Sequence, residues 1–210
     1  MDGVIIDSEP LHHRAERALL SRYQVTITDE ELHSFAGMDA YQLLTGFIEK
    51  YKLPVDFQTF YLMHKENIEK VFRNSDIPAT AAVHFIREVD ARGLPLALAS
   101  SSHRDLIQLV MERLDLSEYF HVIIGGDEIQ RGKPFPDIYI KAAGRLKLSP
   151  EQCVAIEDSK NGVHSAKDAG CFCIGVVNPN SGHQDLSRAD KIIDNFRRLN
   201  VDSVIEWMTE

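Results

Sequence analysis

Residues 94–102 read Leu94-Pro95-Leu96-Ala97-Leu98-Ala99-Ser100-Ser101-Ser102, a continuous apolar run that ends in three serines. A strand that is buried on both faces of a parallel sheet has such an uninterrupted apolar pattern. We therefore predict a parallel strand over Leu94–Ala99. The serines are informative because ligands of open parallel sheets bind beyond the carboxyl ends of the strands.

Downstream of this strand, apolar runs alternate with helical patterns. Further strands are predicted at residues 121–124, 153–156, 172–177 and 191–193. Helices are predicted at residues 82–91, 102–114, 136–146 and 163–169, and the third of them opens at Pro136. Strands that alternate with helices imply right-handed crossovers and a parallel sheet covered by helices on both faces.

Residues 11–73 predict helices only. Thr28 followed by Glu31 is typical of a capping box, and residues 57–72 predict one long amphipathic helix. This segment interrupts the alternation near its start. We therefore predict an α/β fold, with a three-layer Rossmann-like parallel-sheet core at residues 1–10 and 76–210 and an inserted helical cap domain at residues 11–75.

The length, composition and net charge of the chain limit the class of protein that it can be. The 210 residues suffice for a core with an insert, 44% of them are apolar, and the net charge is −9. No basic run with interleaved aromatics is present, so nucleic acid is not an expected partner. No run approaches the ~20 apolar residues of a membrane span. With no visible signal peptide and three cysteines without framework spacing, we expect a cytoplasmic protein.

Four polar clusters follow the ends of predicted strands. They are Asp2 with Asp7, Ser100 to Ser102, Lys133, and Glu157 to Ser159. Paired acids suit a hard cation such as Mg²⁺, and a lysine with a serine hydroxyl suits phosphoryl oxygens. The set therefore favours phosphoryl transfer.

Each of these residues also has a plainer interpretation. Asp2 could be a turn residue before Gly3, and Ser102 with Asp105 a helix cap. Lys133 could be a solvated loop lysine, and Glu157 and Asp158 could be acids of a first helical turn. Their common place at strand ends favours the site.

Four stretches carry a family resemblance. They are Asp2-Gly3-Val4-Ile5-Ile6-Asp7-Ser8-Glu9, Leu98-Ala99-Ser100-Ser101-Ser102, Gly132-Lys133-Pro134-Phe135-Pro136-Asp137-Ile138-Tyr139 and Ile156-Glu157-Asp158-Ser159-Lys160-Asn161-Gly162. In this order they resemble the four motifs of haloacid-dehalogenase superfamily phosphatases, and of their β-phosphoglucomutase-like members in particular. The resemblance implies a Rossmann-like core with a helical cap inserted after the first motif.

The resemblance also implies roles. Asp2 would be the catalytic general acid and base. Mg²⁺ would be held by the backbone carbonyl of Asp2 and the carboxylates of Asp158 and Glu157. Ser100, the backbone of Ser101 and the catalytic Lys133 would bind the phosphoryl group. His12 in the cap would face the substrate.

The first motif of this family begins with a nucleophilic aspartate two residues before the position of Asp2. Met1 matches the residue between the two aspartates. The resemblance thus places the nucleophile directly before Met1, and we expect a start codon that was assigned too late.

We therefore expect a Mg²⁺-dependent phosphatase that hydrolyses small phosphate esters, of sugars or polyols, through a phospho-aspartyl intermediate. A β-phosphoglucomutase-type phosphomutase is one alternative, although Gly37-Met38-Asp39-Ala40 has alanine where the resemblance implies a cap arginine in the mutases. A non-catalytic protein that binds phosphate esters is another. The expected partner is a small-molecule phosphate ester, and we expect a monomer.

Overall fold

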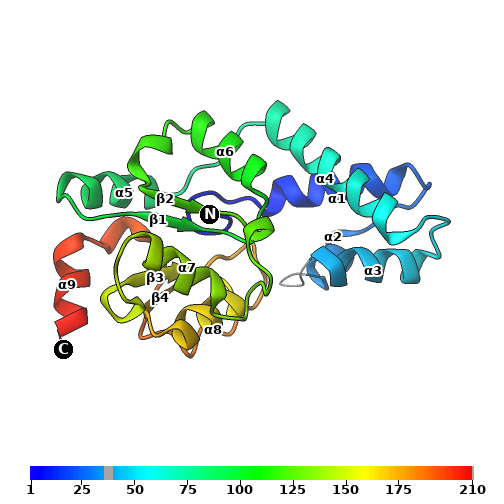
Figure 1. Ribbon diagram of the computed structural model, residues 1–210. Coiled ribbons are helices and arrows are strands. Elements are labelled where there is room, and N and C mark those ends of the chain that lie inside the picture. The colour runs from blue at the N-terminus through cyan, green and yellow to red at the C-terminus, as the bar shows by residue number, and fades with distance from the viewer. Residues whose placement is uncertain (36–39, 210) are drawn as a thin grey trace.

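The computed structural model describes residues 1–35 and 40–209. The helices before the first strand are α1 (Glu9–Ser21), α2 (Asp29–His33), α3 (Ala40–Tyr51), α4 (Phe57–Asn74) and α5 (Ala82–Ala91). Then follow β1 (Ala97–Ala99), α6 (Arg104–Arg113), β2 (Val122–Ile124), α7 (Asp137–Arg145), β3 (Val154–Glu157), α8 (Lys160–Ala169), β4 (Phe172–Val176), β5 (Lys191–Ile193) and α9 (Val201–Thr209). The predicted α/β fold with alternating strands and helices is confirmed (Figure 1).

All pairings between these strands are parallel. β1 pairs with β2, with Leu98 opposite Ile123, and a second sheet has the order β3-β4-β5. Figure 1 shows the N-terminus beside β1 and β2. Residues 1–6 form turns there, and Met1, Val4, Ile5 and Ile6 share one core cluster with Leu98 of β1 and Ile174 of β4.

The first predicted strand is shorter than expected, because it begins at Ala97 and not at Leu94. The amide of Leu94 donates to the carbonyl of Val89, so this residue still belongs to the turn that ends α5. Pro95 has no N–H to offer a sheet ladder, which keeps it out of the strand.

The core has helices on two sides of the strands. Side chains of β4 alternate in direction, as in any strand. Ile174 packs in the cluster of α5, α6 and α9, whereas its neighbour Cys173 packs against Val163 of α8. Ile124 of β2 packs against α7. Helix, strand and helix thus form the three layers that the alternation predicts.

The helices α1 to α4 have a core of their own, to one side of the strands (Figure 1). Its fully buried members include Leu19, Leu44, Phe47 and Phe60. The predicted capping box of Thr28 and Glu31 starts α2. None of the described helices is long and apolar enough to span a bilayer.

Two ends of this helical region pack in the main core. Leu11 at the start of α1 and Phe72 at the end of α4 belong to the cluster of α5 and α6. The side chain of Arg113 on α6 donates to the carbonyls of Phe72 and Ser75, each at 2.7 Å. The proposed cap at residues 11–75 is thus anchored in the core at both of its ends, and its exact boundaries stay a prediction.

We predict that Phe72→Ala lowers the free energy of unfolding by about 3–5 kcal/mol, because the ring is fully buried and its loss leaves a cavity. Leu62→Ala on the same helix is the control, since Leu62 is 50% exposed and its truncation should change stability by less than ~0.5 kcal/mol. Urea unfolding measures both, and equal losses would contradict the anchoring role of Phe72.

Candidate active site

A cavity of about 1180 Å³ lies where the helical region meets the carboxyl ends of the strands. Its walls contain all the residues that the sequence predicts for the site, namely Asp2, His12, Ser100, Ser101, Lys133, Glu157 and Asp158. The helical region adds residues from α1 and α4. The structure therefore brings together residues that are up to 156 positions apart, from Asp2 to Asp158.

Asp2 faces two elements at once. Its Oδ2 accepts hydrogen bonds from Ser102 Oγ at 2.8 Å and, more weakly, from Ser100 Oγ at 3.4 Å. His12 Nε2 on α1 lies 3.5 Å from its Oδ1. Burial would raise the pKa of Asp2, but the contact with His12, the charge of the terminal amino group and the hydrogen bond from Ser102 together outweigh burial and lower it. Asp2 is therefore an ionised carboxylate at neutral pH.

The alternative interpretation of Ser102 as a helix cap is wrong. It does not cap α6, whose N-cap is His103 with no side-chain capping bond. Its hydroxyl donates to Asp2, and its amide donates to Ser100 Oγ at 3.1 Å. A helix cap and a site residue have the same local sequence signal, and only the long-range contact with Asp2 separates them.

Lys133 is held in a buried ion pair. Its Nζ hydrogen-bonds with Glu157 and with the carbonyl of Ala99, the latter at 3.3 Å. Tyr139 of α7 donates its hydroxyl to the same carboxylate oxygen of Glu157. Burial would raise the pKa of Glu157, but the charge and hydrogen bond of Lys133, the hydrogen bond of Tyr139 and the charge of the terminal amino group together outweigh it and lower the pKa. The sequence analysis missed Tyr139, although it quoted this residue within the third motif.

Asp158 lies against the N-terminal loop. A Cβ built on Gly3 would come within 1.7 Å of Asp158 Oδ2, and Gly3 has a φ of +67°, so this position requires glycine. Ser181 Oγ donates to Oδ2 at 3.2 Å. Burial, with the neighbouring charge of Glu157, raises the pKa of Asp158 to about 7. No local pattern marks Ser181, because its loop comes from the far end of the chain.

The donor set fits Mg²⁺ in part. In residues 1–35 and 40–209, no group of three or more acids, histidines or cysteines is arranged to hold a metal ion. Mg²⁺, however, is commonly bound through one or two carboxylates together with waters and phosphate oxygens. Asp158 and Glu157 supply two carboxylates, and burial of Asp158 beside another acid is the situation that a cation relieves. The side chain of Asp2 points to Ser102, which leaves its backbone carbonyl as the predicted ligand.

On the cap side of the cavity, His12, Glu16 and His64 have shifted pKa values. Burial would lower the pKa of His12, but Asp2 raises it above its usual value. Glu16 on α1 is buried, which raises its pKa to about 7, and His64 on α4 is buried, which lowers its pKa to about 4. The sequence analysis found His12 but missed the other two, since each fits an ordinary helix pattern.

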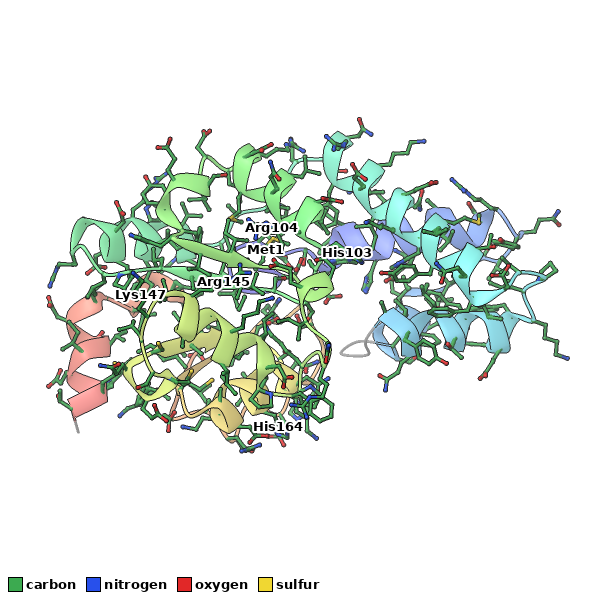
Figure 2. The ribbon with its side chains drawn as sticks, viewed as in Figure 1. Met1, His103, Arg104, Arg145, Lys147 and His164 are labelled. Carbon is green, nitrogen blue, oxygen red and sulfur yellow. The ribbon has the colours of Figure 1, made fainter. Side chains whose placement is uncertain are left out.

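A direct contact joins α4 to the rim of the core. The hydroxyl of Tyr61 hydrogen-bonds with His103 Nε2 at 2.5 Å, and both residues line the cavity. Figure 2 shows His103 on the side of the core that faces α1 to α4.

The stretch 37–39, on which the argument against a mutase rests in part, lies outside the described residues.

Comparison with known proteins identifies the family. Residues 1–176 match the family described as haloacid dehalogenase-like hydrolase. This chain belongs to that family. The predicted resemblance is confirmed, and so is the prediction of a phosphoric monoester hydrolase of this family as the class of enzyme.

Individual relatives agree. A probable pseudouridine-5′-phosphatase from Drosophila melanogaster is 31% identical over 199 residues, which are 92% of this chain and 86% of the relative. A phosphorylated carbohydrates phosphatase from Thermotoga maritima is 33% identical over 178 residues, 84% of this chain and 82% of the relative. The crystal structure of CbbY from Rhodobacter sphaeroides in complex with phosphate superposes with a TM-score of 0.87 at 26% identity, covering 98% of this chain and 96% of that one.

These findings bear on the fold and the class of enzyme. The roles of Asp2, His12, Ser100, Ser101, Lys133, Glu157 and Asp158 stay predictions that the cavity brings together in one place. The monomeric state and the cytoplasmic location also stay predictions.

The burial of Glu16 should make the free energy of unfolding depend on pH. Its pKa is raised from 4.5 to about 7, so the folded chain binds this proton more tightly than the unfolded chain. Stability from this group is present below the unfolded pKa and is lost as the pH rises through about 7. Glu16→Gln removes this loss and should raise the free energy of unfolding at pH 8 by up to ~3 kcal/mol.

Urea unfolding of the Gln variant at pH 5 and pH 8 measures this effect, and the gain should be clearly larger at pH 8. Glu66→Gln is the matched control, because Glu66 lies on α4 with its side chain exposed. A gain from Glu16→Gln that is equal at the two pH values would contradict the buried acid as its cause.

Proposed function

We propose that this protein is a Mg²⁺-dependent phosphatase that hydrolyses small phosphate esters of sugars or polyols. The observation that carries the proposal is the meeting of Ser100, Lys133 and Asp158, from the ends of different strands, in one cavity that the helical region also lines. Phosphoryl transfer needs little else from a protein than positioning and charge stabilisation.

The phosphoryl group would be held by Lys133, the hydroxyl of Ser100 and the backbone of Ser101. The geometry supports this role for Lys133, because Glu157 and the carbonyl of Ala99 fix its ammonium group at the cavity wall. A hydrogen bond from a fixed ammonium group to a phosphate oxygen is among the strong, charge-assisted ones. The acidic net charge of −9 repels anions at long range, so such local cations must supply the attraction.

Mg²⁺ would be held by Asp158, with Glu157 and the backbone carbonyl of Asp2. When bound, the ion would neutralise charge on the phosphoryl group during transfer. Asp158 is the better placed of the two acids, since Lys133 and Tyr139 already occupy Glu157.

Asp2 would act as the general acid and base, which protonates the leaving oxygen and accepts a proton from the attacking water. In the free protein it is ionised, which is the form that accepts a proton from an attacking water. A bound phosphoryl group adds negative charge beside it, and a like charge raises the pKa of a carboxyl group. Binding of the ester therefore favours the protonated form, which is needed to protonate the leaving oxygen.

The phosphoryl acceptor would be the aspartate that the first motif places directly before the position of Met1. Attack of its carboxylate on phosphorus would give a phospho-aspartyl intermediate and release the alcohol. Water activated by Asp2 would then release phosphate and restore the carboxylate. The substrate class rests on the relatives, whose names include a phosphorylated carbohydrates phosphatase and a probable pseudouridine-5′-phosphatase.

Asp158→Asn should lower Mg²⁺-dependent phosphate release from a hexose phosphate by at least ~100-fold, because the amide loses the charge that holds the metal. The control is Asp115→Asn, at an exposed position whose φ of +53° asparagine adopts readily. Phosphate release over a Mg²⁺ titration is the measurement. Undiminished activity of Asp158→Asn would remove this residue from the metal site.

The acceptor is tested by comparing the 210-residue chain with one that carries the motif's strand and aspartate before Met1. Phosphate release should require the added aspartate, since removing a nucleophile has cost on the order of 10⁶-fold elsewhere. Equal activity of both chains, abolished by EDTA, would contradict this mechanism. A requirement for a sugar bisphosphate would favour the mutase alternative, and binding without release would favour the non-catalytic one.

A further inference from the structure

Two buried polar side chains lie on the cap wall of the cavity, and one of them has unused hydrogen-bonding capacity. Glu16 and His64 are each only 6% exposed, and both line the cavity. Nε2 of His64 makes no hydrogen bond within residues 1–35 and 40–209. A buried polar group without a partner costs stability, which calls for an explanation.

The backbone around this pair is fixed. Glu16 lies one helical turn after His12, on the same face of α1. His64 lies on α4, one turn before Asn67, and the side chain of Asn67 donates to the carbonyl of Ala15 on α1. This contact holds the two helices together beside the pair, so the two groups are positioned before any ligand arrives.

The charges of the cap wall limit what the pair can bind. His64 is a neutral imidazole at pH 7, because burial and the nearby charge of His12 lower its pKa. A neutral imidazole offers one donor and one acceptor. Burial raises the pKa of Glu16 to about 7, so above this pH its carboxylate accepts hydrogen bonds and repels anions.

We propose that Glu16 and His64 form a specificity subsite that binds uncharged hydroxyl groups on the organic part of the phosphate ester. Hydroxyl groups can donate to Glu16 and exchange hydrogen bonds with His64, and they bring no charge into the wall. The inference rests on the proposed function, because it needs the phosphoryl group to be bound at Lys133. It goes beyond it by naming the residues that select polyol esters over esters whose organic part is negatively charged.

The physical basis of the selection is desolvation. An ester without hydroxyl groups would leave the hydroxyl-binding side chains buried and unpaired. This cost strongly favours binding of the hydroxylated ester. Above pH 7, a carboxylate or a second phosphate on the ester would also meet the charge of Glu16 in a buried place, where charges are poorly screened.

Calorimetric titration with Mg²⁺ present tests the subsite. The ligands are inorganic phosphate, sorbitol 6-phosphate and phosphoglycolate, and the pH is 8, where Glu16 is ionised. Sorbitol 6-phosphate should bind at least ~10-fold more tightly than phosphoglycolate. Equal affinity for the two esters, or a preference for phosphoglycolate, would overturn the inference while binding of inorganic phosphate leaves the proposed function standing.

Two variants separate the two residues. Glu16→Gln should reduce the preference for sorbitol 6-phosphate over phosphoglycolate by ~10-fold or more, because it removes the charge and keeps the shape. His64→Leu should weaken the binding of sorbitol 6-phosphate by ~10-fold relative to the binding of inorganic phosphate, because it removes the hydrogen bonds of the imidazole.

The control is again Glu66→Gln, which should change neither ratio, and thermal melting verifies that each variant is folded. Unchanged ratios in both folded variants would overturn the subsite. If the wild-type chain binds neither phosphate nor any of the esters, the proposed function fails and this inference fails with it.

Discussion

The buried carboxylate of Glu157 is the interaction on which the rest of the site depends. It ends β3, and it accepts hydrogen bonds from Lys133 in one loop and from Tyr139 on α7. A buried ion pair of this kind adds little net stability, but removing one partner leaves an uncompensated charge and is costly. Its consequence is geometric: Lys133 is held beside the ends of β1 and β3, which is where the cavity lies.

The same charge sets the chemistry next to it. Because Glu157 stays ionised, the adjacent Asp158 is buried beside a negative charge, and its pKa rises to about 7. Two acids in one buried place with a single lysine have excess negative charge. A divalent cation beside Asp158 would relieve that excess.

Most of the fold could be predicted from the sequence, because buried parallel strands and amphipathic helices leave local patterns. The strand at residues 97–99 and its serines, the lysine loop and the paired acids were all found in this way. Residues that act through distant partners were not. Tyr139 and Ser181 matter because of what they contact across the chain, and Ser102 was open to misinterpretation because the signal of a helix cap is the same as that of a site residue.

The cap wall, formed by α1 and α4, carries two buried residues that no local sequence pattern marks as site residues. Glu16 and His64 cost the fold stability, since burial shifts both of them away from their charged forms. A core built for stability alone would have apolar residues at these positions. Binding sites are where such costs are commonly found, because groups left unsatisfied in the free protein are satisfied by the ligand. The cap thus gives up stability at the place where the organic part of an ester would lie, and the strand ends hold the charges that its phosphate needs.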